Sequence, residues 1–199
     1  MNFSNNTIGG KYMKNRYLLP ICMAATAFLS GCALVAPRYT ASIDNVQNIK
    51  NADIQPVKVG TFESIPGDGN NNPISIRGSS LTSPYDSSYA KYIAEALTQD
   101  LELAGKLSPD AKIEISGALR KNDINIPPVG SGTGELEARF VVKRAGGVKY
   151  DQVKSVHDVW DSSFVGAVAI PRAQARYPVM VQKLLAELYA DPAFIAALK

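Results

Sequence analysis

The sequence predicts a single α+β domain in which two main helices pack on one face of a largely antiparallel sheet of about four strands. Two patterns lead to this fold class. Apolar residues recur at helical spacing in two segments, 89–104 and 173–188, which predicts amphipathic helices. Apolar and polar residues alternate in four other segments, which predicts strands over 55–62, 111–122, 135–144 and 148–160. The chain order is therefore strand, helix, three strands and helix.

The first strand is followed by a long break in the pattern. Val57 and Val59 alternate with polar or small residues, which indicates a strand with one buried face. Residues 64–84 then contain the run Pro-Gly-Asp-Gly-Asn-Asn-Asn-Pro, and only one short strand is expected among them, at 74–77. Because loops longer than about 12 residues are often functional or disordered, this segment is predicted to be the mobile element of the domain.

The first helix has its own start and stop signals. Residues 86–88 offer side-chain oxygens that can cap a helix N-terminus, and Gly105 follows the last apolar position as a stop. The apolar positions form one stripe, made of Tyr89, Ile93, Ala96, Leu97, Leu101 and Ala104. One face of this helix is therefore predicted to be buried.

The last three strands are predicted to follow one another as neighbours, with a hairpin turn at residues 145–147. The final strand changes phase after Tyr150, which predicts a bulge or a doubly buried segment near 151–153. The second helix is expected to begin near Pro171, and Pro178 is expected to kink or interrupt it. A short helix through Leu198 closes the chain.

The N-terminal residues have the order of an export signal. Basic residues precede an apolar stretch over 17–29, and the small residues Ser30 and Gly31 follow it. The tetrapeptide Leu-Ser-Gly-Cys at 29–32 resembles the lipobox of bacterial lipoproteins, in which the cysteine is acylated and becomes the first residue of the mature chain. A single transmembrane helix over 17–36 is the alternative, but small residues at its distal end and positive charges only before it favour a cleaved signal.

The lipobox resemblance implies a division of the chain into three parts. Residues 1–31 form the signal peptide, within which Met13 is an alternative start, residues 32–54 form a polar lipidated tether, and residues 55–199 form the globular domain. The resemblance also implies a diacylglyceryl group and an amide-linked acyl chain such as palmitate on Cys32. By the sorting rule of enterobacterial lipoproteins, Ala33 favours the outer membrane, since aspartate at that position favours the inner membrane.

Charge and cysteine content exclude several classes of function. The chain has a net charge of +3 from 21 basic and 18 acidic residues, but Lys11, Lys14 and Arg16 precede the cleavage site and no acidic residue does. Cleavage therefore removes three of the 21 basic residues and leaves 18 against 18 acidic ones. This balance disfavours nucleic-acid binding. Because Cys22 lies in the signal and Cys32 holds the lipid, the mature chain has no disulfide and no thiol nucleophile.

The element order resembles that of the compact α+β domain of several envelope lipoproteins. These are the lipopolysaccharide-assembly lipoprotein, auxiliary lipoproteins of lipid-moving ABC systems, and lipoprotein activators of peptidoglycan synthases. The resemblance covers residues 55–189 and includes the segment Ile-Ser-Gly-Ala-Leu at 115–119, while residues 165–171 resemble a segment of uncharacterised bacterial lipoproteins. It concerns topology, and topology does not by itself carry function.

His157, Glu135 and Glu137 are the residues to weigh for catalysis. His157 is the only histidine, so it allows no His-rich metal site, and its neighbour Asp158 is expected on the opposite face of the strand. No Gly-x-Ser-x-Gly elbow accompanies it. Glu135 and Glu137 share a strand face with Arg139 and have the residue type of glycosidase acids. We favour alternating charges on a solvated sheet face as the explanation for both.

Two further clusters have simpler interpretations. Gly-Ser-Gly-Thr-Gly at 130–134 lacks the Lys-Ser or Lys-Thr of a phosphate loop and precedes a strand, so it is predicted to be a flexible connector. Tyr85, Tyr89 and Tyr92 gather at the start of the first helix, where they form either a glycan- or partner-binding patch or part of the core.

The sequence therefore predicts a non-enzymatic, periplasm-facing outer-membrane lipoprotein that serves as an accessory or assembly factor for an envelope machine through contact with an envelope protein. No catalytic residue, cofactor or metal site is assigned, and Cys32 is assigned as the lipidation site. Two alternatives stay open. An envelope glycan or peptide hydrolase requires Glu135, Glu137 or His157 to converge in one concave pocket, and the other alternative is a structural subunit of a lipoprotein oligomer.

Overall fold

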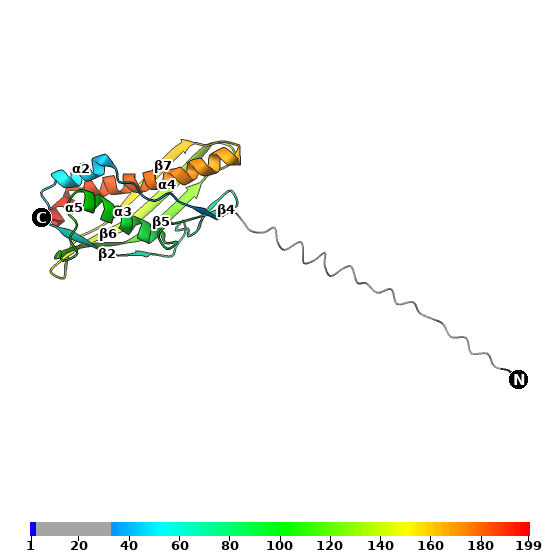
Figure 1. The fold of residues 1–199 in the computed structure, drawn as a ribbon, viewed down its shortest axis with the longest axis horizontal. Helices are drawn as coiled ribbons and strands as arrows, with labels where there is room; N and C mark the ends of the chain where they lie inside the picture. The colour runs from blue at the N-terminus through cyan, green and yellow to red at the C-terminus, as the bar shows by residue number, and fades with distance from the viewer. Residues whose placement is uncertain (3–32) are drawn as a thin grey trace. The chain divides into compact units, whose positions relative to one another are not determined.

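The computed structural model describes residues 1–2 and 33–199 (Figure 1). The predicted signal segment, apart from residues 1–2, and the predicted lipidation site Cys32 lie outside the described residues. Residues 33–199 belong to one compact unit. In the part of the chain that the structure describes, no helix is both long enough and apolar enough to cross a bilayer.

The main sheet has four strands, as the sequence predicts. Its strands are β2 (Val57–Ser64), β5 (Ile113–Asn125), β6 (Ser131–Arg144) and β7 (Gly147–Asp161), in the order β2-β5-β6-β7. Only β2 and β5 run parallel, and helix α3 (Tyr89–Leu103) makes the crossover between them. Helix α4 (Gly166–Tyr189) follows β7 and lies with α3 against one face of the sheet (Figure 1). The predicted α+β fold and its element order are confirmed.

A second, three-stranded sheet was not predicted as such. It consists of β1 (Ala33–Val35), β4 (Ser79–Thr82) and β3 (Ile74–Ile76), in the order β1-β4-β3, with β1 parallel to β4. The tight turn between β3 and β4 places Arg77 at φ 45° and Gly78 at φ 80°. The sequence indicated only the strand at 74–77, because Ile-Ser-Ile in β3 alternates apolar and polar residues whereas β1 is apolar throughout and β4 has a single apolar residue.

The segment predicted as a polar tether is instead part of the fold from Ala33 onward. After β1 the chain forms helix α2 (Ile43–Asn51), whose N-terminus is capped by the Ser42 side chain. Asn45 and Ile49 are buried, and the Asn45 side-chain amide donates a hydrogen bond of 2.9 Å to the carbonyl of Gln182 in α4. The recurring asparagines suggested a solvated linker, whereas one of them is a buried contact between helices.

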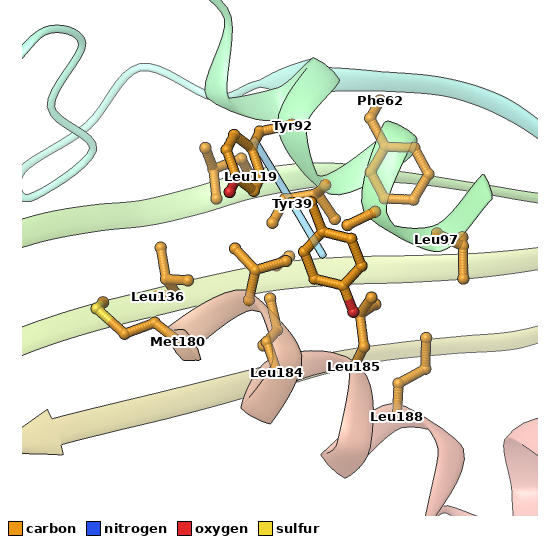
Figure 2. Packing of buried hydrophobic residues seen from close by; sticks show 14 of the residues in the cluster. Tyr39, Phe62, Tyr92, Leu97, Leu119, Leu136, Met180, Leu184, Leu185 and Leu188 are labelled. Atoms are coloured by element: carbon orange, nitrogen blue, oxygen red, sulfur yellow. The ribbon is translucent and has the colours of Figure 1, made fainter. Parts of the chain in front are cut away.

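The hydrophobic core lies between the main sheet and helices α3 and α4 (Figure 2). The predicted stripes of both helices are buried, including Leu97, Leu101, Leu184 and Leu185, each 0% exposed. Figure 2 shows Tyr39, from the N-terminal segment, among these leucines, where its ring packs edge-on against Tyr92 at 6.5 Å between centroids. The N-terminal segment therefore completes the core.

Two local predictions differ in position from the structure, and a third agrees with it. Helix α4 begins at Gly166, five residues before Pro171, and continues through Pro178 without interruption. The register of β6 with β7 shifts between the pairs Val142–Tyr150 and Lys143–Val148, so the bulge lies before the predicted 151–153. Helix α5 (Pro192–Ala197) is capped by the Asp191 side chain, in agreement with the predicted short helix.

Candidate functional site

The side of the main sheet that faces away from the helices is the open face of the domain. It carries Glu114, Ser116, Glu135, Glu137, Arg139, Val141, Asp151, Val153 and His157. Cross-strand ion pairs on this face join Lys58 to Glu114 at 3.5 Å, Arg120 to Glu137 at 3.3 Å, Lys121 to Glu135, and Arg139 to Asp151. The open face is therefore a mosaic of paired charges of both signs, and such exposed pairs contribute little stability.

The largest depression in the described residues lies on this face, between β2, β5, β6 and β7. Its volume is about 500 Å³, and it is lined by Thr61, Glu63, Glu114, Ser116, Arg139, Val141, Lys143 and Asp151 among others. The Arg139 guanidinium donates two hydrogen bonds to the Asp151 carboxylate, and these bonds lower the pKa of that carboxyl. The lining mixes apolar side chains with charges of both signs, of which Glu114, Arg139 and Asp151 belong to ion pairs, and it differs in this from the mostly apolar lining of small-molecule sites.

Glu135, Glu137 and His157 do come together on the open face. The register places Glu135 opposite His157, and His157 Nδ1 lies 3.3 Å from Glu135 Oε1. All three line a depression of about 240 Å³ together with Lys121 and Ser155. The hydrogen bond from Lys121 lowers the pKa of Glu135, so this carboxyl is ionised at neutral pH. A glycosidase acid needs the opposite shift, because it must hold a proton at neutral pH.

His157 and Asp158 point to opposite faces of β7, as predicted. His157 is exposed on the open face, whereas Asp158 is 2% exposed on the covered face. The Asp158 carboxylate accepts hydrogen bonds of 2.8 and 2.9 Å from Arg176 and one of 2.6 Å from Lys183, both in α4. Asp158 therefore fastens α4 to the sheet and is not available to orient His157.

The glycines at 130–134 are structural rather than a flexible connector. Residues 131–134 are the first residues of β6, and Gly132 and Gly134 face α4 and Trp160. A Cβ at position 132 would lie 2.5 Å from the Trp160 ring, and a Cβ at position 134 would lie 2.5 Å from the Met180 sulfur. Glycine is required at position 132, where the rigid Trp160 ring fills the space, whereas at position 134 the flexible end of Met180 could move aside. The sequence pattern alone gave no signal of this packing.

The tyrosines at the start of α3 hold the N-terminal segment against the domain. Tyr89 and Tyr92 are 1% and 0% exposed. The Tyr92 hydroxyl donates a hydrogen bond of 2.8 Å to the Pro37 carbonyl, and the Tyr85 hydroxyl accepts one of 3.2 Å from the Tyr39 N–H. Of the two interpretations left open by the sequence, the structure supports the core interpretation for Tyr89 and Tyr92.

Asp100 is a buried carboxyl that sequence reasoning missed. It lies on the core side of α3 at 0% exposure, and its oxygens accept hydrogen bonds from the hydroxyls of Tyr39, at 3.1 Å, and Tyr189, at 3.2 Å. Burial raises the pKa of Asp100 to about 6, although the two hydroxyls act in the opposite direction. Asp100 therefore joins three segments, which are residues 33–42, α3 and α4. In the sequence, its position on the apolar face of the predicted helix was the one signal that it is buried.

Metal chemistry finds no support in the arrangement of side chains. Within residues 1–2 and 33–199, no three His, Cys, Asp or Glu side chains are grouped so that they could hold a metal ion. The buried carboxylates Asp100 and Asp158 each have hydroxyl or cationic partners.

The comparisons with known proteins establish a shared fold. No family model matches the sequence, and no curated protein matches it. Among solved structures, protein XCC0632 from Xanthomonas campestris, assigned to the family DUF330, is similar at 10% identity with a TM-score of 0.57, over 82% of this chain and 96% of that chain. The hypothetical protein CT253 from Chlamydia trachomatis is similar at 12% identity with a TM-score of 0.46, over 72% and 99% of the two chains.

A minor lipoprotein from Acinetobacter baumannii is similar at 6% identity with a TM-score of 0.38, over 67% of this chain and 91% of that chain. At such identities and TM-scores, the lipoprotein neighbours add no argument about activity. The first similarity shows that this chain has the small α+β fold of XCC0632.

Proposed function

We propose that the protein is a non-enzymatic lipoprotein, anchored by acyl chains on Cys32 to the outer membrane on its periplasmic side, that serves an envelope machine as an accessory or assembly factor. One observation carries the anchoring. The first strand of the fold begins at Ala33, directly after the cysteine at which the lipobox-like sequence predicts cleavage. A mature chain that starts at Cys32 would therefore keep the whole folded unit and lose only the segment before it.

The open face supports binding to a protein rather than to a small molecule. It is broad and shallow, its depression between β2, β5, β6 and β7 has a volume of about 500 Å³, and it carries charges of both signs, several of them paired across the strands. Protein partners recognise such mosaics by matching charges, which gives specificity and fast association more than raw affinity. We therefore assign the contact with an envelope protein to this face.

The anchor is tested by processing of two cysteine variants. Cys32→Ser should abolish acylation and the detergent partitioning of the mature protein, whereas Cys22→Ser, a matched change within the signal, should leave both intact. Mass spectrometry of the mature N-terminus measures the result. A mature chain that retains residues 17–29, or that carries an unmodified Cys32, would contradict the anchor.

The contact surface is tested by crosslinking in intact cells. A photo-reactive residue at Val153, which is 38% exposed on the open face, should give an adduct with an envelope protein that mass spectrometry identifies. The control is Ile43, which is 85% exposed on α2, away from the open face. Adducts at Ile43 without any at Val153 would show that the partner binds elsewhere.

The depression that holds Glu135, Glu137 and His157 favours a second candidate, an envelope glycan or peptide hydrolase. Purified protein incubated with peptidoglycan should release no soluble fragments if the accessory role holds. Release that is lost in Glu135→Gln but kept in Glu63→Gln, an open-face control in the other depression, would establish the hydrolase.

A further inference from the structure

One end of the domain carries a cluster of exposed apolar side chains. Val129 is 81% exposed, Phe164 77%, Val165 55% and Val168 45%. They lie on the loop between β5 and β6 and at the start of α4, and together they form what we name the apical patch. Contiguous exposed apolar side chains on a folded domain mark a surface that contacts a partner or a membrane.

Arg77 gathers the loops that carry the apical patch. From the turn between β3 and β4, its guanidinium donates hydrogen bonds to the carbonyls of Ile126 at 2.8 Å, Pro127 at 2.5 Å, Ser163 at 2.9 Å and Phe164 at 3.1 Å. Because one guanidinium reaches both loops, the segments around Val129 and Phe164 are held side by side. The guanidinium of Arg77 points at backbone carbonyls, so Arg77 holds the loops that carry the apical patch in position.

The segments that meet at this end contain no charged residue other than Arg77, and the exposed Asp161 and Arg172 border them at the end of β7 and within α4. Lys, Arg, Asp and Glu are absent from residues 33–37, 78–84, 124–134 and 162–171, although charged residues make up 20% of the chain. An uncharged surface has no ionic groups to desolvate on entering an apolar phase, and it does not repel anionic headgroups. This composition therefore fits a lipid surface better than it fits a charged protein partner.

The anchor enters the fold at the same end. Ala33, the residue after Cys32, pairs with Ser80 in β4, three residues after Arg77. Figure 1 shows β4 and the start of α4 at the end of the domain opposite the C-terminus. Because consecutive Cα atoms are about 3.8 Å apart, an acylated Cys32 would hold this end of the domain at the membrane surface with no spacer.

We propose that the apical patch of Val129, Phe164, Val165 and Val168 inserts into the headgroup region of the membrane that holds the lipid on Cys32. The proposal rests on the proposed lipid anchor. The anchor supplies the acyl chains and the patch supplies a second contact, which fixes the orientation of the domain on the bilayer. The β6–β7 turn then lies at the far end of strands that extend about 40 Å from the patch.

The test uses the full chain, lipidated in a bacterial host and reconstituted at one copy per nanodisc of phosphatidylethanolamine and phosphatidylglycerol. Cysteine replaces Val129 or Phe164 and carries an environment-sensitive fluorophore, while Val148→Cys, a valine that is 56% exposed beside the β6–β7 turn, is the matched control. The introduced cysteine is the one free thiol, because Cys22 is removed with the signal and the lipid occupies Cys32.

Labels at 129 and 164 should shift to shorter emission wavelengths on reconstitution and should be quenched by lipids with a nitroxide on the acyl chain, whereas the label at 148 should do neither. Equal behaviour of the three labels, with Cys32 acylated by mass spectrometry, would overturn the insertion alone. An unmodified Cys32 would overturn both the anchor and the insertion. A wavelength shift without quenching would show that the labels do not reach the acyl chains and would also overturn the insertion.

A charge placed in the patch gives an independent check. Phe164→Asp should abolish the nitroxide quenching of the label at 129, because a carboxylate resists entry into the bilayer interface. Val148→Asp should leave that quenching unchanged. Both positions are exposed, so neither variant disturbs the core, and unchanged circular dichroism verifies this. Quenching at 129 that persists in Phe164→Asp would overturn the proposal.

Discussion

Asp151 and Asp158 lie seven residues apart on β7, and each binds an arginine through two hydrogen bonds, yet they lie on opposite faces of the sheet. Asp151 meets Arg139 on the open face, where both side chains reach solvent. Asp158 meets Arg176 and Lys183 beneath α4, at 2% exposure. The two ion pairs therefore differ in how strongly the protein depends on them for stability. Burial removes the water that would otherwise compete for the Asp158 carboxylate.

The contrast between the faces is greatest for a charge placed in the core. Leu97→Asp or Leu185→Asp should unfold residues 33–199, because an unpaired buried carboxylate costs several kcal/mol against a total stability of about 5 to 15 kcal/mol. Val153→Asp on the open face should change the free energy of unfolding by less than about 0.5 kcal/mol. Thermal unfolding followed by circular dichroism compares the three, and a native-like transition in either leucine variant would refute the assigned core.

The buried Asp100 should make stability depend on pH. Its folded-state pKa of about 6 lies above the ordinary value of 3.8, so its contribution is fully present below pH 3.8 and is lost as pH rises through about 6. The loss is on the order of 3 kcal/mol. A hydrogen bond from Lys154 is the chief cause that lowers the pKa of Asp191 to about 2. The stability that Asp191 contributes is therefore lost as pH falls below 3.8, a range that does not overlap with that of Asp100.

The variant Asp100→Asn isolates the contribution of Asp100 to the pH dependence of stability. Denaturant unfolding between pH 4 and 6 should show the wild-type free energy of unfolding falling relative to that of the variant, which has no proton to lose at this position. Parallel curves for the two proteins across this range would mean that Asp100 titrates alike in the folded and unfolded states.

Removing each aspartate of the opening pair tests the comparison directly. Asp158→Ala should lower the free energy of unfolding by about 2 kcal/mol, because it leaves Arg176 and Lys183 without their shared acceptor while both remain partly solvated. Asp151→Ala should cause no measurable change. Chemical denaturation of both variants under one condition provides the measurement. Equal losses in the free energy of unfolding would show that ion pairing rather than burial decides how much each aspartate stabilises the fold.

The smallest effects are expected on the open face. His157→Ala, Glu135→Gln and Glu137→Gln should each leave unfolding unchanged and should preserve the crosslink from Val153, because a broad contact surface tolerates loss of a single peripheral charge. Releasing the anchor by Cys32→Ser should reduce the same crosslink, since it lowers the local concentration at the partner. Loss of the crosslink in one of the three charge variants would identify that residue as a centre of the interface.

Long elements with regular apolar spacing could be predicted from the sequence. The stripe of α3 and the alternation in β5 and β6 are long enough to dominate over local irregularities, so their order and buried faces are as expected. Helix α2 was not predicted, because only Val46 and Ile49 mark its inner side among polar residues. Its stability comes from contacts with distant segments, which no local pattern records.

The chemistry of the candidate site was only partly predictable. The alternation of β6 placed Glu135 and Glu137 on one face correctly, but their partners Lys121 and Arg120 depend on the register with β5, which shifts between Leu119 and Lys121. The role of the glycines at 132 and 134 could not be predicted from the sequence, because they leave space for Trp160 and Met180, which come from other elements.

The bonded N-terminal segment has a mechanical consequence for an anchored protein. Successive residues after Ala33 are held by hydrogen bonds to β4, α3 and α4, through the groups of Leu34, Val35, Ala36, Pro37, Tyr39 and Thr40. A pull applied at Cys32 along β1 would strain several of these bonds together, because β1 and β4 run parallel. A pull that lifts Ala33 away from β4 would break them one at a time. The domain should therefore resist force on the proposed anchor best when that force acts along the direction of β1.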